Sequence, residues 1–116
     1  MSDYRKLTLW QEAMNLVEGV YRITQGFPPE ERFGLVIQMR RAAVSIASNI
    51  AEGASRGNKR EFLQFLRIAK GSHAELETQI EIARRLGFLN DELSQGIERV
   101  GKILGGLLKS LVSRNP

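Results

Sequence analysis

Apolar residues recur at intervals of three and four through most of the chain, with polar and charged residues between them. This spacing is typical of amphipathic α-helices, and no segment alternates with the two-residue period of a half-buried strand. The pattern predicts four helices near residues 8–25, 35–55, 59–87 and 91–112. Helices of this length joined by short links favour one all-α domain over residues 1–116, an antiparallel up-down four-helix bundle.

The predicted helix ends rest on capping residues and on turns. A turn is expected at Pro28 and Pro29, and Gly87 is expected to close the third helix. The expected N-terminal caps are Thr8, Asn58 with Glu61, and Asn90, and the glycines available to end the second helix are Gly53 and Gly57. The short links then place consecutive helices side by side and antiparallel.

The core is expected along one apolar stripe of each helix. In the first helix the stripe is Trp10, Ala13 or Met14, Val17, Tyr21 and Thr24, with both aromatic rings in the core. In the third helix it is Phe62, Leu66, Ala69, His73, Leu76, Ile80 and Ala83. In the fourth it is Leu93, Ile97, Val100, Leu104, Leu107 and Leu111. His73 is therefore expected as a satisfied, partly buried imidazole.

Two helix faces outside the predicted core are expected to contact something beyond solvent. The second helix carries a short-chained polar stripe, and its two ends, Arg41 and Glu52, lie too far apart to pair with each other. Each needs a partner from another helix, another copy of the chain, or solvent. The fourth helix has a wide apolar arc, which fits either a deeply set helix in a monomer or a subunit interface. The candidate interface residues are Arg41, Ser45, Ser48, Glu52, Ile103, Leu108 and Val112.

Positive charge is concentrated in one segment. Residues 40–70 hold seven bases and two acids, whereas the rest of the chain is close to neutral and the total is +4. Such a local excess is either a solvated face that pairs with acids elsewhere in the fold or the electrostatic footprint of a nucleic-acid binder, with RNA as the first candidate. The candidate contacts are Arg56, Lys59, Arg60, Arg67 and Lys70. Recognition would be mainly of the phosphate backbone, since Phe62 and Phe65 belong to or border the core.

Catalytic and metal-binding motifs are missing from the sequence. The chain has one histidine and no cysteine, and Lys70 occupies the position where a di-iron bundle would need glutamate before His73. The segment "GASRGNK" has neither the spacing nor the preceding strand of a phosphate-binding loop. We therefore expect no enzyme activity, no metal and no cofactor. With no apolar signal core and no long apolar run, we expect a cytoplasmic protein that does not enter a membrane.

Four segments carry a resemblance to a known family. The stretch "RRAAVSIASNIAEG", with "LWQEAM", "FPPEERFGL" and "GSHAELETQIEIARRLGFL", resembles the four-helix-bundle proteins encoded in intervening sequences of bacterial 23S ribosomal RNA genes. The match runs from about residue 7 to 111. Three positions depart from the family pattern: Ala47 stands where proline is usual, Val36 where threonine is frequent, and His73 where leucine is common.

The resemblance implies an all-α bundle that closes into a homopentameric ring. It also implies similarity to the accessory protein of diversity-generating retroelements, which binds a reverse transcriptase and nucleic acid through a basic surface. It supplies no catalytic residue. Two functions stay open: a nucleic-acid-binding module, or an oligomeric protein-interaction scaffold with no nucleic-acid role. Binding to a polyanion should weaken steeply with salt, whereas binding to a mostly apolar protein surface should not.

Overall fold

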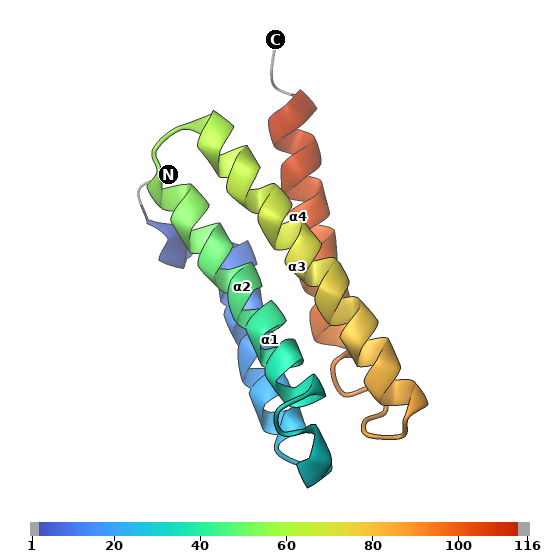
Figure 1. Cartoon of the computed structure of the whole chain (residues 1–116). Helices are drawn as coiled ribbons and strands as arrows, with labels where there is room; N and C mark the ends of the chain where they lie inside the picture. Colours follow the sequence, from blue (N-terminus) through green and yellow to red (C-terminus); the bar gives the residue numbers. More distant parts are fainter. Residues whose placement is uncertain (1–2, 114–116) are drawn as a thin grey trace.

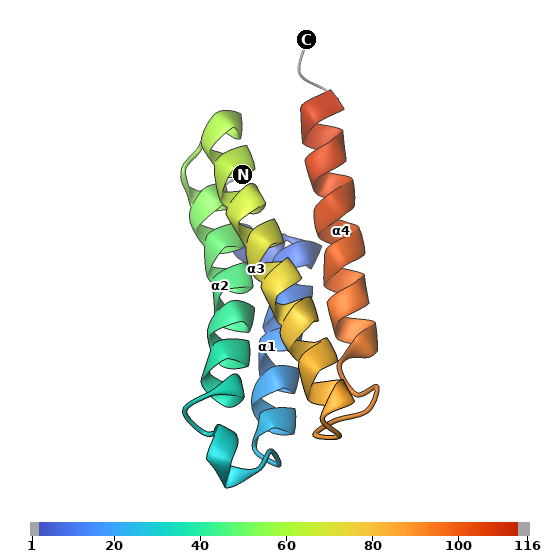
Figure 2. The same cartoon turned by 45° about the vertical axis from the view of Figure 1, so that its right-hand side comes forward.

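The computed structural model describes residues 3–113, which form four α-helices and two short 3₁₀ turns and contain no strand. The helices are α1 (Thr8–Thr24), α2 (Leu35–Ser55), α3 (Lys59–Arg85) and α4 (Ser94–Ser113), and the 3₁₀ turns are η1 (Tyr4–Lys6) and η2 (Pro29–Glu31). Successive helices run antiparallel, and each packs on two neighbours: α1 and α3 both contact α2 and α4 (Figures 1 and 2). The predicted all-α four-helix bundle is confirmed.

The start of α1 at residue 8 is confirmed, whereas two of the predicted caps, Thr8 and Asn90, and the start of the fourth helix are wrong. Thr8 is already inside α1, and Leu7 precedes the helix with an extended backbone and no side-chain cap. The fourth helix begins at Ser94 rather than near residue 91, because residues 91–93 form a turn. In this turn Glu92 Oε1 accepts a hydrogen bond from the Asn90 backbone N–H at 2.6 Å, and Ser94 N–H donates to Asp91 O. Asn90 therefore shapes the loop and does not cap α4.

The core stripe of α1 is rotated from the predicted one. The buried positions are Leu9, Ala13, Leu16, Gly19, Val20 and Thr24. Tyr21 is 42% exposed and Trp10 is half-buried at the rim, where its ring meets Tyr4 edge-on. The prediction that Tyr21 lies in the core is wrong: leucine and valine fill the narrow space between the helices, while the tyrosine ring lies at the surface against the Arg40 guanidinium.

The other stripes follow the sequence more closely. In α2 the apolar stripe at helical spacing, Leu35, Met39, Ala42, Ala43, Ile46 and Ile50, is buried. Ala47 lies inside one continuous helix, with no break where the family usually has proline. In α3 every predicted position except His73 is fully buried. In α4 burial stops at Leu104; Leu107 and Leu111 are only partly covered. Within residues 3–113, no helix is long and apolar enough to cross a membrane.

Candidate nucleic-acid interface and subunit surfaces

The turn between α2 and α3 brings the two ends of the predicted basic segment together. Gly57 adopts a left-handed backbone with φ +84°, which favours glycine, and lets the chain reverse within three residues. Asn58 then caps α3: its Oδ1 accepts from the Glu61 backbone N–H at 2.9 Å, and its Nδ2 donates to the Glu61 carboxylate. The predicted Asn58–Glu61 cap is confirmed, and it fixes the first turn of α3 on which two of the bases lie.

Gly53 has a different role from the one expected. It does not end α2; it is buried inside the helix, against the start of α3. A Cβ at position 53 would lie 2.7 Å from Phe65 Cβ and 3.2 Å from Phe62 Cδ1. Glycine is therefore needed here for close approach of the two helices, and this contact holds the basic segment rigidly on the bundle.

Arg56 is already engaged by neighbouring side chains. Its guanidinium lies 2.7 Å from Glu52 Oε2 and 3.6 Å from Glu61 Oε1, and it sits over the Phe65 ring at 5.0 Å from the centroid. Both acids would compete with a phosphate for this arginine. Among the five predicted contacts, Arg56 therefore carries the least available positive charge.

The other four predicted bases differ from Arg56. Arg60, Arg67 and Lys70 are exposed along α3, and Lys59 is half-buried in its first turn. None of the four forms an ion pair with a described residue. They lie in the first half of α3, at the end of the bundle that also holds the end of α4 (Figure 1). We call Lys59, Arg60, Arg67 and Lys70 the α3 basic patch.

The bases at the opposite end of α3 provide a contrast. Arg84 and Arg85 both bind the Glu81 carboxylate, at 3.1 and 2.9 Å. Hydrogen bonds from Arg85, and then from Arg84, hold the pKa of Glu81 below its usual range. The bases of α3 that form no ion pair with a described residue thus all lie in its N-terminal half, although bases occur at both ends of the helix.

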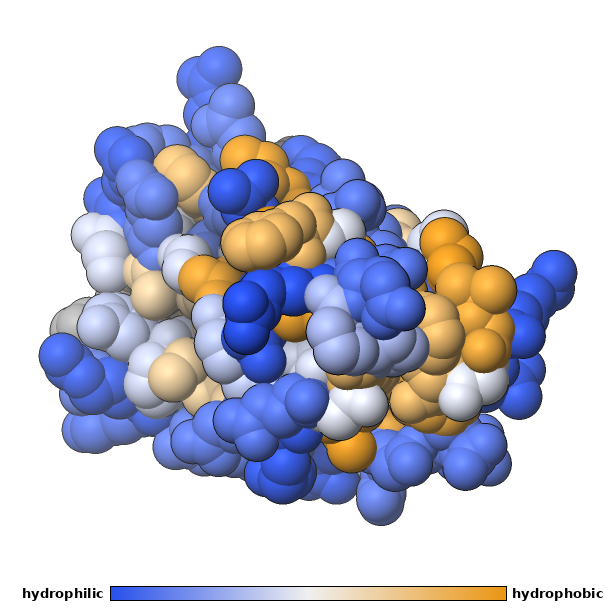
Figure 3. Space-filling model, turned by 60° about the horizontal axis from the view of Figure 1, so that its bottom comes forward, coloured by the Kyte–Doolittle hydropathy of each residue, from blue (hydrophilic) through white to orange (hydrophobic). Residues whose placement is uncertain are grey.

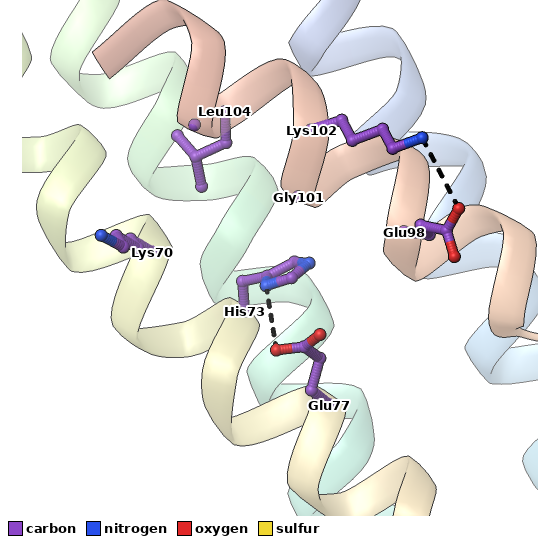
Figure 4. A pocket seen from close by; sticks show the side chains of 8 residues that line it. Lys70, His73, Glu77, Glu98, Gly101, Lys102 and Leu104 are labelled. Carbon is purple, nitrogen blue, oxygen red and sulfur yellow. Dashed lines mark ion pairs between the residues drawn. The ribbon is translucent and has the colours of Figure 1, made fainter. Parts of the chain in front are cut away.

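Lys70 also borders a hollow of about 370 Å³ between α3 and α4 (Figure 4). His73 is mostly buried beside it, and its Nε2 lies 2.7 Å from the Ile97 carbonyl oxygen. Because a carbonyl only accepts, Nε2 carries the hydrogen and donates it. Glu77 Oε1 lies 3.7 Å from Nδ1, and Lys102 pairs with Glu98 along α4 at the edge of the hollow. The expected satisfied, partly buried imidazole is confirmed.

The hollow has no set of metal ligands. Among residues 3–113, no three histidine or carboxylate side chains come together in a way that could hold a metal ion. The His73 ring instead fills the space above Gly101, where a Cβ would lie 2.8 Å from Cε1. Histidine at the position where the family commonly has leucine is thus matched by a glycine on the facing helix.

The polar stripe on α2 is partly satisfied within the chain. Ser45 and Ser72 join α2 to α3 by a hydroxyl–hydroxyl hydrogen bond of 2.8 Å, and Glu52 pairs with Arg56 one turn further along. Glu52 is exposed, as the solvent alternative expected, and it also finds a partner that was not expected, in the residue that follows its own helix. Arg41 and Ser48 are exposed, and Arg41 has no ion pair with a described residue.

The predicted apolar interface residues lie between the middle and the end of α4. Ile103 and Leu108 are half-buried, and Val112 is 49% exposed. No residue of α4 beyond Leu104 is fully buried. Figure 2 shows this half of α4 at the edge of the bundle, at the same end as the start of α3 but set apart from it. We call Leu107, Leu108, Leu111 and Val112 the α4 apolar surface.

Arg40 is a further residue with an unusual setting, and the sequence did not single it out as a site. Its side chain is half-buried between α1 and α2 and is bound to Thr24 and Tyr21. The only signal in the sequence is its place in a pair of arginines at the start of an otherwise small-residue helix. Periodicity alone did not indicate that one arginine of the pair is exposed while the other is held against α1.

Comparison with known proteins agrees with the fold and with the quoted segments. The model of the family described as 23S rRNA-intervening sequence protein matches residues 5–108, which include all of α1, α2 and α3 and most of α4. No curated protein matches the chain. The matched span covers nearly the whole bundle and includes the α3 basic patch, the capping turn before it and part of the α4 apolar surface. The chain therefore belongs to the 23S rRNA-intervening sequence protein family.

Proposed function

We propose that this protein is a non-catalytic, self-assembling module that binds nucleic acid, RNA in the first place, through the α3 basic patch. The observation that carries the proposal is the absence of any ion pair between these four bases and another described residue. A group of cations without counter-charges on a helix favours binding to a polyanion. It does not favour the alternative, in which these bases pair with acids elsewhere in the fold. An RNA-binding role in a chain without cysteine fits the cytoplasm.

Recognition would depend on phosphates more than on bases. Beside the patch, Phe62 is buried and Phe65 is partly covered and lies under Arg56. Phe33 is 82% exposed, but it lies near the α1–α2 turn, at the opposite end of the bundle. Without an aromatic platform next to the bases, we expect little sequence preference. Each phosphate contact should add about 0.7 to 0.9 to the slope of log affinity against log salt.

The test is to titrate RNA against a charge-reversed variant at several salt concentrations. Lys59→Glu, Arg60→Glu and Arg67→Glu together should weaken binding at least about tenfold at low salt and reduce the salt slope by about 2. The matched control reverses three exposed bases outside α3, with Lys6→Glu, Arg22→Glu and Lys109→Glu. Because both variants change the net charge equally, equal losses would indicate non-specific attraction. A folded α3 variant that binds as well as the wild type would remove the RNA proposal.

The second candidate function is an oligomeric scaffold, and the α4 apolar surface favours it. Four aliphatic side chains in the last two turns of α4 lack full cover within the chain. Burying such a stripe against another subunit is a common way for soluble proteins to remove it from water. We propose a homo-oligomer, with five copies on the basis of the family resemblance, and Arg41, Ser48 and the α4 residues as contacts.

Light scattering on the purified chain at micromolar concentration tests assembly. We expect a mass that is a multiple, fivefold for a pentamer, of the 13.1 kDa chain. Leu108→Asp with Val112→Asp should lower that mass, and Arg41→Glu should weaken assembly if Arg41 meets an acid of the neighbouring copy. Ile82→Asp, at an exposed apolar position on α3, is the control. A monomeric wild type would contradict the proposal.

A further inference from the structure

Arg40 is fixed in place by neutral groups only. Its Nε donates to Thr24 Oγ1 at 3.0 Å, its Nη2 donates to the Tyr21 carbonyl oxygen at 3.3 Å, and its guanidinium lies 4.4 Å from the centre of the Tyr21 ring. Thr24 is buried, and its hydroxyl hydrogen is directed to the Val20 carbonyl oxygen at 2.7 Å. The threonine oxygen therefore faces Arg40 as an acceptor. This arrangement orients the guanidinium before any ligand arrives.

The charge of Arg40 is not balanced by the chain. Neither Arg40 nor Arg32 forms an ion pair with a described residue. Arg40 uses two of its five N–H groups in the bonds above, so both hydrogens of Nη1 and one of Nη2 are uncommitted. A cation that is partly removed from water without a counter-charge costs free energy, and a bound anion would offset that cost.

A pocket of about 340 Å³ lies beside Arg40, at the turn between α1 and α2. Its polar side holds Arg32 and Arg40, its apolar walls are Phe27, Pro28, Pro29 and Val36, and no carboxylate lines it. Figure 3 views the end of the bundle that carries this turn, where strongly hydrophilic and apolar side chains lie next to each other. The volume is at the lower end of the range for small-ligand sites.

We propose that this pocket binds a phosphate ester: the phosphate lies between Arg32 and Arg40, and the organic group lies against Phe27 and the two prolines. Two guanidinium groups match the double negative charge of a phosphate monoester better than the single charge of a carboxylate. The site is distinct from the α3 basic patch, since none of the four bases of that patch lines the pocket. The phosphate can belong to a small metabolite or to the 5′ end of an RNA.

The site is tested by calorimetric titration with three ligands: phenyl phosphate, inorganic phosphate and phenylacetate. Sodium chloride keeps the ionic strength constant. Phenyl phosphate should bind more tightly than inorganic phosphate, because its ring adds contact with the apolar walls, and more tightly than phenylacetate. Arg32→Gln and Arg40→Gln should each weaken phenyl phosphate binding at least about tenfold, the loss expected for a charge-assisted hydrogen-bonding partner. Arg22→Gln, an exposed arginine of α1 that does not line the pocket, should bind as the wild type does.

Several outcomes would overturn the inference. They are the absence of phenyl phosphate binding by the wild type, equal binding by Arg32→Gln, and phenylacetate binding as tight as that of phenyl phosphate. Arg32 is exposed, so its variant stays informative even if Arg40→Gln unfolds. A second titration compares one RNA with and without a 5′ phosphate. If the 5′ phosphate raises the affinity for RNA and Arg32→Gln removes that increase, the phosphate comes from RNA. If the two RNAs bind with equal affinity while phenyl phosphate binds, the ligand is a small ester.

Discussion

The α2–α3 pair and α4 differ in how much of each helix is buried. Ten of the 21 residues of α2 are buried although many of them are alanine or glycine, because small side chains let the α3 backbone come close. Only three of the 20 residues of α4 are fully buried although it is rich in leucine, because no neighbour covers its second half. Burial is thus determined by which helices approach each other and not by the hydropathy of one helix.

This difference separates the two proposed roles. The close α2–α3 contact, with Gly53 against Phe65 and Ser45 bonded to Ser72, holds the α3 basic patch on a rigid support. The α4 apolar surface remains available to a second subunit. Both lie toward the same end of the bundle (Figure 1), so assembly through α4 would bring the basic patches of several copies near each other. Several weak phosphate-binding surfaces would then act together by avidity.

The largest effect on stability is expected from Gly53→Ala. The new Cβ would lie 2.7 Å from Phe65 Cβ, which cannot swing away because it is attached directly to the α3 backbone. Separating the helices should lower the free energy of unfolding by about 2 kcal/mol or more. Urea denaturation followed by circular dichroism measures it. The matched control is Gly105→Ala on α4, where no atom lies within 4 Å of the added carbon.

Gly105→Ala should be neutral or stabilising by up to about 1 kcal/mol, because alanine is the better helix former. The two alanine variants therefore test the contrast between the α2–α3 contact and the uncovered half of α4 with the same chemical change. If Gly53→Ala costs no more than Gly105→Ala, the close approach of α2 and α3 is not what stabilises the bundle.

A smaller effect is expected where α4 does meet α3. In Gly101→Ala the added carbon would lie 2.8 Å from His73 Cε1, but the imidazole is the end of a flexible side chain and can turn away. The cost should be about 1 kcal/mol, near that of the lost hydrogen bond to the Ile97 carbonyl. In a His73→Ala background the same substitution should become neutral or stabilising. A double-mutant cycle measures the difference, and additive effects would contradict the coupling.

The sequence predicted the elements better than their orientation. The spacing of apolar residues gave four helices, and Asn58 with Glu61 gave one helix start correctly, because both signals are local. The face of α1 was misjudged, because Trp10 with Tyr21 and Leu9 with Leu16 form competing stripes at helical spacing. Only the approach of α2 and α4 decides between them. The partial burial of α4 depends on the same long-range geometry.

For the candidate sites too, the sequence predicted local features but not contacts between distant residues. The charges of the α3 basic patch were visible in the sequence, but the pairing of Arg56 with Glu52 and Glu61 was not, because it depends on the turn at Gly57. The setting of Arg40 could not be predicted for a related reason. Its contacts with Thr24 and Tyr21 join residues 16 and 19 positions apart, which the helical repeat of α2 alone cannot indicate.

The smallest effect is expected from the one ion pair that joins α1 to α4 among residues 3–113. Arg99 Nε lies 3.2 Å from Glu12 Oε2, with the arginine largely exposed and the glutamate mostly covered. A pair in this setting should contribute about 0.5 kcal/mol to the coupling energy, and salt should screen it.

The measurement is a double-mutant cycle of Glu12→Gln and Arg99→Gln at low and high sodium chloride. The pair of Glu98 and Lys102 within α4, at 3.7 Å, serves as the control. A coupling well above about 1 kcal/mol that persists at high salt would mean that charge, and not the apolar contacts of Ile97, Val100 and Leu104, holds α4 on the bundle.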